Sequence, residues 1–399
     1  MTKPLPASAS SAATAPWPHH EPDELAAAQR VLASGKTNYW TGDEARSFER
    51  EYASFLDRRH AVALHNGTLA LELALAVLGI GPGDEVITTP RTFIASASAA
   101  VMRGATPVMA DVDRDSGNLT ASTVEAVRTP RTRAVIAVHL GGWPVDMPAL
   151  MDLGRAHGIA VIEDCAQAHG ATIDGRPVGA HGDLAAFSFC QDKILTTAGE
   201  GGLLVLDDER MWRAAWAYKD HGKSFEAIYE RDHPPGFRYV YESFGTNWRI
   251  TEIQAAIGRI QLRKLPLWHA RRHAIGSRLD AAFRDLPALR VPVVPDDLRH
   301  AYYRAYAYVR PNALRSDWDR QRIADEISAQ GVPCYVGSAA EIYREKAFRD
   351  AGLAPAAPLP VARELGETSL CFLCHPTLTD EHVERAVEVV TAVMGRATR

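Results

Sequence analysis

Several features that define large classes of protein are missing from this 399-residue sequence. No run approaches the ~18 consecutive apolar residues that a transmembrane helix requires. The N-terminal stretch MTKPLPASASSAATAPWP contains one lysine and no apolar core, so it is typical of neither a signal peptide nor a membrane anchor. We therefore expect a flexible N-terminal leader over residues 1–18 and no membrane partner.

Cysteine is scarce, and acidic and basic residues are mixed along the chain. The five cysteines are an odd number, and most lie within apolar runs, where a free thiol behaves as a small hydrophobic side chain. This pattern indicates a reducing, cytoplasmic setting. Cys371 and Cys374 form a CxxC, but no second Cys or His pair with zinc spacing accompanies it, so we expect no metal site. The net charge of −5 offers no basic face for a nucleic acid.

Three loops that identify common enzyme classes are absent as well. No GxGxxG follows the first predicted strand and no GxxxxGK[ST] occurs, so the phosphate loops of dinucleotide-binding and P-loop proteins are missing. There is no GxSxG elbow, which argues against a hydrolase of that kind.

The features that are present describe a compact α/β protein. A content of 46% hydrophobic and 23% charged residues is typical of globular proteins, and the length suits one large domain plus a smaller one. Short β-rich runs alternate with helical patterns from about residue 60, as in a largely parallel sheet. Only a short glycine turn joins the last two runs, which predicts an antiparallel pair in a mixed sheet. The predicted strands are 60–67, 84–90, 106–113, 133–142, 159–167, 184–193 and 201–208.

Helical spacing of apolar residues predicts helices at 68–80 and 145–158, and a long amphipathic helix at 249–279. The pattern changes after that helix. A strand at 300–311, a helix at 317–331 and a closing helix after Pro376 predict a smaller α+β domain. We expect a large domain over residues 19–265 and a small C-terminal domain over residues 266–399.

Polar residues where predicted strands end are the first candidates for a site, because ligands of open α/β sheets bind beyond the carboxyl ends of the strands. Asn66, Gly67 and Thr68 end one strand and begin a helix, whose free N–H groups suit a phosphate. An ordinary helix cap explains the same residues. Asp164 ends another strand, with Gln167 three residues later. A buried carboxylate needs a partner, which a cationic ligand group, a helix cap or a structural salt bridge could each supply.

A lysine in an apolar setting is the third candidate. Ser188 and Lys193 lie on the run FSFCQDKILTTAGEGG, where a strand leads into a glycine turn. A desolvated lysine has a lowered pKa and can act as a nucleophile or base, whereas a lysine that faces solvent would have no such role. Asn247 and Arg249 precede the long amphipathic helix, which could serve as an interface.

Taken in order, the motifs NGTLALELAL, TFIASASA, EDCAQAHGA, SFCQDKILTTAGEGG and GTNWRITEIQAAIG resemble the DegT/DnrJ/EryC1/StrS family of pyridoxal-phosphate-dependent sugar aminotransferases. The resemblance extends from about residue 20 to the C-terminus. It implies the aspartate-aminotransferase-like fold (fold type I), with a large PLP-binding domain on a mixed seven-stranded sheet and a small C-terminal domain. It also implies a homodimer with shared active sites.

The resemblance assigns roles to individual residues. Lys193 matches the catalytic lysine that forms a Schiff base with pyridoxal 5′-phosphate. Asp164 matches the partner of the pyridine nitrogen, and Gln167 the neighbour of the ring hydroxyl. The remaining cofactor contacts would be the phosphate ligands Gly67, Thr68 and Ser188, the stacking aromatic Phe93, and Asn247, which would reach the cofactor phosphate of the neighbouring subunit.

The implied reaction moves an amino group from an amino acid, expected to be L-glutamate, to a nucleotide-linked 3- or 4-keto hexose, with pyridoxamine 5′-phosphate as the intermediate cofactor form. Two alternatives remain open at this point: a keto-cyclitol or other antibiotic-pathway acceptor, and a non-catalytic cofactor-binding regulator. A family branch that dehydrates sugars has histidine in place of the lysine, so Lys193 favours transamination. The segments 336–346 and 374–378 could face the substrate or pack within the small domain.

Overall fold

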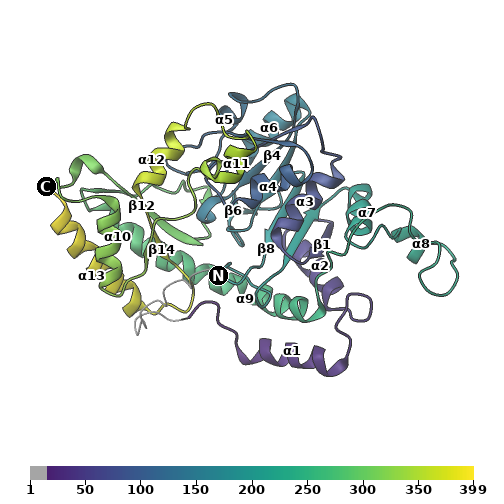
Figure 1. Ribbon diagram of the computed structural model, residues 1–399. Coiled ribbons are helices and arrows are strands. Elements are labelled where there is room, and N and C mark those ends of the chain that lie inside the picture. The colour runs from purple at the N-terminus through teal and green to yellow at the C-terminus, as the bar shows by residue number, and fades with distance from the viewer. Residues whose placement is uncertain (1–15) are drawn as a thin grey trace.

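A seven-stranded mixed sheet forms the centre of the protein, which is described by a computed structural model over residues 16–399 (Figure 1). Its strand order is β1-β9-β8-β5-β4-β2-β3, and only β9 runs antiparallel to the other strands. The predicted mixed sheet and its antiparallel closing pair are therefore confirmed. The strands are β1 (His60–Leu64), β2 (Glu85–Thr88), β3 (Thr106–Met109), β4 (Thr132–Val138), β5 (Ala160–Asp164), β8 (Leu184–Ser188) and β9 (Gly202–Leu206).

Both faces of this sheet are covered, which explains why its strands are nearly continuous apolar runs. Successive residues of a strand point to opposite faces, so Ala61 and Ala63 belong to one buried cluster while Val62 and Leu64 belong to the other. Helices α3 (Gly67–Val77), α4 (Ala95–Met102) and α7 (Glu209–Tyr218) cover one face. Helices α2 (Glu44–Phe55), α6 (Met147–His157) and the first part of α9 (Glu252–Arg284) cover the other.

A second, antiparallel sheet carries the C-terminal part of the chain and lies to the left in Figure 1. Its order is β10-β12-β14-β13, formed by β10 (Leu289–Arg290), β12 (Arg304–Val309), β13 (Cys334–Tyr335) and β14 (Ser369–Leu373). Helices α10 (Arg320–Ala329), α13 (Asp380–Ala397) and the end of α9 pack on it to form its core. Helix α9 is continuous over 33 residues and joins the two sheets. The division into domains 19–265 and 266–399 stays a proposal, and its boundary falls inside this helix.

The remaining elements are short or peripheral. A small three-stranded sheet pairs β11 (Leu298–Arg299) with β6 (Thr172–Ile173) and β7 (Arg176–Pro177). Helix α1 (Pro22–Ser34) packs on α9 through Ala27 and Val31. The other helices are α5 (Ala121–Glu125), α8 (Phe225–Tyr229), α11 (Lys346–Asp350) and α12 (Pro360–Thr368), with 3₁₀ turns at Leu140–Gly142, Pro311–Ala313 and Ile342–Arg344.

All seven predicted strands of the large sheet form, and each ends before its predicted C-terminal boundary. The run predicted at 184–193 stops at Ser188, and the run at 159–167 stops at Asp164. Cys165 and Phe189, which follow these points, stay buried in the core, and Gln167 and Lys193 reach the cavity wall from the turns that come next. Helices α1 and α2 were not predicted at all.

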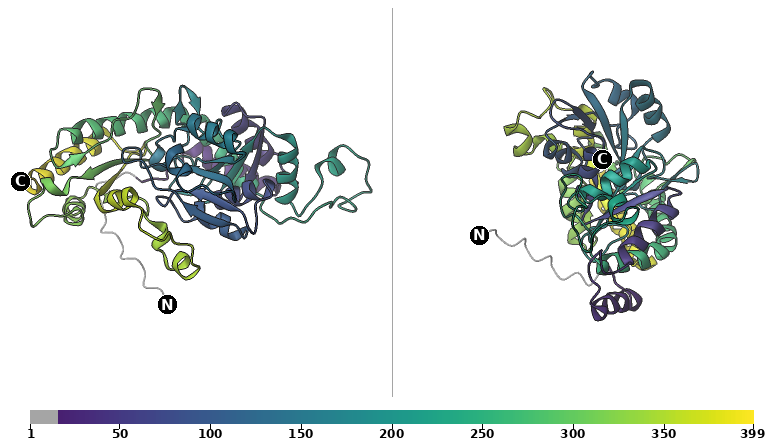
Figure 2. Two further views of the ribbon diagram at one scale, coloured as in Figure 1. Left: turned by 90° about the horizontal axis from the view of Figure 1, so that it is seen from above. Right: turned by 90° about the vertical axis from the view of Figure 1, so that its right-hand side faces the viewer.

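Two segments extend from the main body. Of the predicted leader, residues 1–15 lie outside the described part, whereas Pro16, Trp17 and Pro18 are described and contact the protein. The segment that contains α8 protrudes on one side (Figure 2), whereas Lys219 and Asp220, which precede it, are fully buried. Among residues 16–399, no helix combines the length and the apolar character needed to span a bilayer.

Candidate active site

A cavity of about 300 Å³ opens where the carboxyl ends of the large-sheet strands meet the second sheet. The large-sheet side provides Phe93, Gln167, Asp192 and Lys193 to its wall. The second sheet and its loops provide the other side, which consists of Tyr303, Arg304, Tyr306, Tyr335, Gly337, Ser338 and Cys371. Three of the predicted site residues, Phe93, Gln167 and Lys193, therefore line one cavity.

Lys193 lies in the turn after β8, and its side chain is 16% exposed. Its ammonium nitrogen Nζ is 3.8 Å from Asp192 Oδ1 and 5.2 Å from the ring centre of Tyr303. The Lys193 carbonyl accepts a hydrogen bond of 3.1 Å from the indole Nε1 of Trp17. The amine therefore faces the cavity, while its backbone is tied to the N-terminal segment.

Trp17 also packs against three other side chains, which fix the position of its indole ring and so of its hydrogen bond to Lys193. Its ring stacks on His375 with centroids 6.0 Å apart, meets Trp268 edge-on at 5.3 Å and lies 5.1 Å from the guanidinium of Arg272. The neighbouring Pro16 carbonyl accepts a hydrogen bond of 3.0 Å from Thr377 Oγ1. Residues 16–18 thus connect α9, the second sheet's C-terminal loop and the lysine turn.

Asp164 ends β5 and is 6% exposed. Ser96 Oγ donates to its Oδ2 at 2.8 Å, and the Ala166 backbone N–H donates to its Oδ1 at 3.1 Å. Burial raises the pKa of Asp164 above its ordinary value, although these two hydrogen bonds and the charge of Lys193 act in the opposite direction. No cation lies within 4.0 Å of this carboxylate among residues 16–399, so a cationic group of a ligand would be a favourable partner.

Gln167 and Phe93 offer a donor and an apolar surface. The Gly141 backbone N–H donates to Gln167 Oε1 at 2.7 Å, which leaves the amide nitrogen as the free polar group. Phe93 follows β2, and its ring is 68% exposed on the cavity wall. An exposed phenyl ring in a cavity is suited to stack on a flat ligand.

The turn at the start of α3 contacts the end of β8 closely. A Cβ atom added to Gly67 would lie 2.6 Å from the Cβ of Ser188, so no other residue fits at position 67 without displacing the strand. Asn66 caps the helix by accepting the Leu69 N–H at 3.0 Å, and the preceding N–H groups of α3 stay free. Together with the Ser188 hydroxyl, they can hold an anion.

Thr68 and Asn247 are exposed and do not line the cavity of their own chain. Thr68 lies in the first turn of α3, next to Gly67. Asn247 pairs with Asp220 in an isolated bridge, and the adjacent segment runs beside the end of β1 through a hydrogen bond from His65 N to Trp248 O. Of the eight predicted residues, three thus line the cavity, and these two lie on the surface. The other three, Gly67, Asp164 and Ser188, lie at or just after the carboxyl ends of β1, β5 and β8 and are not part of the cavity wall.

The sequence analysis did not identify the second-sheet wall. Tyr303 directs its hydroxyl to Asp192 Oδ2 in a short hydrogen bond, which links this wall to the lysine turn. Burial alone would raise the pKa of Asp192, but Lys193, Tyr303 and Arg304 outweigh burial and hold that pKa below its ordinary value. Burial raises the pKa of the Cys371 thiol to about 11, so this thiol is protonated at neutral pH. The alternation of polar and apolar residues in the segment YYRAYAY predicts a strand with two different faces, but it does not tell which of the two faces lies toward Lys193.

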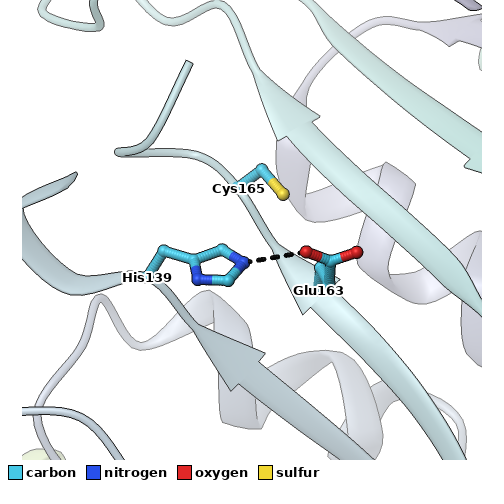
Figure 3. Close-up of side chains that lie close together, drawn as sticks. All are labelled: His139, Glu163 and Cys165. Atoms are coloured by element: carbon cyan, nitrogen blue, oxygen red, sulfur yellow. Dashed lines mark hydrogen bonds and ion pairs between the residues drawn. The ribbon is translucent and has the colours of Figure 1, made fainter. Parts of the chain in front are cut away.

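Two further features, one cluster of side chains and one buried lysine, could be mistaken for a site. His139, Glu163 and Cys165 lie together behind β5, where His139 Nε2 is 3.1 Å from Glu163 Oε2 (Figure 3). The other ring nitrogen accepts the Val145 N–H, and Glu163 also accepts three backbone N–H groups from residues 179–182. These hydrogen bonds outweigh burial and lower the pKa of Glu163 to about 2. Because the lone pairs are already engaged, the cluster is structural rather than a vacant metal site.

Lys219 is the other notable lysine. It is fully buried, its Nζ has no hydrogen-bond partner within the described residues, and it lies 3.3 Å from the ring centre of Tyr39. Burial lowers its pKa to about 8. Lys219 is remote from the cavity wall, so its low pKa does not make it the reacting amine.

Comparison with known proteins gives the same family over most of the chain. The model of the DegT/DnrJ/EryC1/StrS aminotransferase family matches residues 18–391. The chain is 37% identical to the dTDP-3-amino-3,4,6-trideoxy-α-D-glucose transaminase of Streptomyces venezuelae, covering 94% of this chain and 92% of that protein. It is 35% identical to the spore coat polysaccharide biosynthesis protein SpsC of Bacillus subtilis, covering 94% and 95%. It is 36% identical to the UDP-N-acetyl-3-dehydro-α-D-glucosamine 3-aminotransferase of Acidithiobacillus ferrooxidans, covering 88% of both.

Solved structures agree with the fold. An aminotransferase from Psychrobacter cryohalolentis matches with a TM-score of 0.94 and 52% identity, covering 96% of this chain and 98% of that one. The PLP form of the putative sugar aminotransferase Spr1654 from Streptococcus pneumoniae matches with a TM-score of 0.85 and 26% identity, covering 96% and 99%.

Proposed function

Because the chain belongs to the DegT/DnrJ/EryC1/StrS aminotransferase family, we propose that this aminotransferase uses pyridoxal 5′-phosphate to move an amino group from L-glutamate to a nucleotide-linked keto-sugar. The observation that carries the proposal is the free amine of Lys193 on the cavity wall, with the buried carboxylate of Asp164 close enough for the two charges to interact. A free amine and a buried carboxylate without a cationic partner are the two groups that this cofactor requires. The names of the dTDP- and UDP-sugar aminotransferases among its relatives support the substrate class.

The residues at the site fit each part of the cofactor. The free N–H groups of Gly67 and Thr68 and the hydroxyl of Ser188 suit the phosphate, and the lack of a side chain at Gly67 lets the start of α3 approach Ser188 closely. Phe93 offers a ring face, and the free amide nitrogen of Gln167 can donate to the ring hydroxyl.

Asp164 would keep the ring nitrogen protonated. Burial makes this carboxylate a costly charge by itself, so a pyridinium N–H beside it would lower the pKa of Asp164 and stabilise the ion pair. The bound cofactor supplies an electron sink for the pair of electrons left when a proton leaves the carbon that bears the amine. Ser96 orients the carboxylate through its hydrogen bond to Oδ2.

Lys193 has two tasks in this proposal. Its Nζ would hold the cofactor, and as a free amine it would take a proton from the substrate carbon that bears the amine and return a proton during the transfer. Asp192 and the ring of Tyr303 limit where the amine can go, because both lie beside Nζ.

A second copy of the chain would complete the site. Asn247 is exposed and lies outside the cavity of its own chain, and the protruding segment beside it carries the strongly exposed aromatic residues Tyr239 and Phe244. We propose that the protein is a homodimer in which Asn247 reaches the cofactor phosphate of the other subunit. All five cysteines are free thiols, which supports a cytoplasmic location.

The decisive experiment is an acceptor panel. Protein loaded with pyridoxal phosphate is incubated with L-glutamate and dTDP- or UDP-linked 3-keto and 4-keto hexoses, with keto-inositols as the alternative acceptors. We expect an amino-sugar nucleotide and an equal amount of 2-oxoglutarate. If only the keto-inositols are aminated, the acceptor is a keto-cyclitol and not a nucleotide-linked sugar. If no amino acid donates an amine to any acceptor, the proposal is refuted. Lys193→Ala is the negative control.

A further inference from the structure

Arg304 stands out on the cavity wall because its charge has no acidic partner. It is the first residue of β12, and its guanidinium carbon lies 4.4 Å from the ring centre of Tyr303. Its Nη1 donates to the Tyr303 carbonyl at 3.1 Å. Within residues 16–399, no carboxylate oxygen lies within 4.0 Å of its guanidinium nitrogens.

Another arginine on the same sheet shows how such a group is usually neutralised. Arg290, on β10, also lies on a tyrosine, with its guanidinium carbon 4.5 Å from the ring centre of Tyr308. Unlike Arg304, it forms an ion pair of 2.6 Å with Asp115. Stacking on tyrosine is therefore common to both residues, and only the cavity residue lacks a counter-charge.

Among the described residues, the surroundings of Arg304 compensate its charge only in part, because Asp192 interacts with it from beyond ion-pair distance. Arg91 is fully buried behind the cavity wall, with the ring centres of Tyr306 and Tyr308 at 5.1 and 5.4 Å from its guanidinium carbon, and its Nε and Nη2 have no hydrogen-bond partner within the part of the chain that the structure describes. Arg272, near the lysine turn, is likewise fully buried, and two of its nitrogens have no partner in the same part of the chain. The one carboxylate on the cavity wall, Asp192, is engaged by Tyr303 and lies beside Lys193. The wall therefore has an excess of positive charge, which favours an anion in the cavity.

We propose that Arg304 is an anion subsite that binds a carboxylate of the substrate. A guanidinium fork matches the two oxygens of a carboxylate and forms two charge-assisted hydrogen bonds. Arg304 and the Lys193 amine contact the same ring of Tyr303, so a carboxylate on Arg304 brings the adjoining carbon chain toward the reacting amine. The inference rests on the proposed function, which supplies two sources of this group: the amino-acid donor or an acidic keto-sugar.

A binding experiment tests the subsite without turnover. Glutarate, an unreactive dicarboxylate, is titrated into the cofactor-loaded protein and its variants by calorimetry. Since hydrogen bonds to charged groups contribute about 1.5–3 kcal/mol, Arg304→Gln should weaken binding about 10- to 100-fold. Arg304→Lys, which keeps the charge but not the fork, should lose less, and Arg290→Gln should bind as the wild type does. Equal binding by wild type and Arg304→Gln would overturn the proposal.

Single-turnover measurements identify the source of the carboxylate. If the donor binds here, Arg304→Gln slows the reaction with L-glutamate and raises the concentration needed for half-saturation. If the sugar binds here, only the transfer to a keto-sugar that bears a carboxylate is affected. No change in either arm contradicts the subsite. If Arg304→Gln lowers the melting temperature strongly, Arg304→Lys is used for the binding and turnover tests in its place, because a lysine retains the contact with the Tyr303 ring.

Failure of the proposed function can be recognised separately. Glutarate binding that depends on Arg304, in a protein that transfers no amine, would keep the subsite and refute the aminotransferase reaction. If the protein transfers an amine but binds glutarate equally well without Arg304, the aminotransferase reaction stands and the Arg304 subsite is refuted.

Discussion

The two walls of the cavity come from different parts of the chain and differ in how far their polar groups are paired. On the large-sheet side, Asp164 accepts two hydrogen bonds and Gln167 accepts one, so their positions are fixed before any ligand arrives. On the second-sheet side, Arg304 has no acid and Tyr335 is half exposed. This difference supports the proposal that the first wall holds the cofactor and the second binds a charged substrate.

The largest expected effect comes from the amine itself. Lys193→Ala should lower the turnover rate by about four orders of magnitude or more, as for residues that act as both nucleophile and base. Stability should change little, because Nζ makes no hydrogen bond in the structure. Steady-state kinetics and thermal melting measure the two effects. Lys219→Met is the control: it should keep turnover within a few-fold, and an equal loss there would contradict the assignment.

Asp164→Asn should cause the second-largest loss of turnover rate, because it removes the carboxylate from the large-sheet side of the cavity. Removing one partner of a buried ion pair costs about 3–5 kcal/mol, which corresponds to a loss of roughly 10²- to several 10³-fold in rate. Ser96→Ala keeps the carboxylate and should lose far less. Wild-type turnover by Asp164→Asn would show that the ring nitrogen needs no acid.

Although Asp164→Asn should slow turnover, it should stabilise the folded protein when no cofactor is bound. The folded-state pKa of Asp164 is raised, so ionisation makes the folded state less stable as the pH rises above about 4, the value for an unfolded aspartate. Asp164→Asn should therefore raise the melting temperature of the cofactor-free protein at pH 8, and the gain should vanish near pH 4. A constant gain at all pH values would contradict this account.

A smaller effect is expected at the junction of the two walls. Asp192→Asn should slow turnover about tenfold, since a positioned charge near the amine contributes roughly 1–2 kcal/mol. The pKa of Asp192 is below its ordinary value, so the charge is present at all pH values above about 4 and is lost only as the pH falls through that lowered value. The loss of rate should therefore be the same from pH 6 to pH 9. Asp115→Asn, far from Lys193, should have wild-type rates.

The weakest expected effect is at the N-terminal contact. Trp17→Phe keeps the ring but removes the hydrogen bond to the Lys193 carbonyl, which should cost about 0.5–1.5 kcal/mol in stability or a few-fold in rate. Denaturant unfolding and steady-state kinetics measure it. A chain that starts at Pro16 keeps every contact described for Trp17 and should match the full-length protein. A full-activity variant that starts at His19 would show that the contact is incidental.

The first wall could be predicted from sequence to a large extent, and the second could not. Asp164, Ser188 and Lys193 follow apolar runs that predict buried strands, and the carboxyl ends of parallel strands meet at one edge. Tyr303 and Arg304 lie more than 100 residues later, at the start of a strand in another sheet. Their place depends on how that sheet packs against the first, which local patterns do not encode. The role of Asn247 depends on a second chain and stays a prediction.

The central claim is that Lys193 carries the cofactor, and covalent trapping tests it directly. The protein loaded with pyridoxal phosphate is reduced with borohydride, digested and mapped by mass spectrometry. We expect the phosphopyridoxyl group on the peptide that contains Lys193. Labelling of Lys219, the buried lysine whose pKa is about 8, or no labelled peptide at all, would contradict the account.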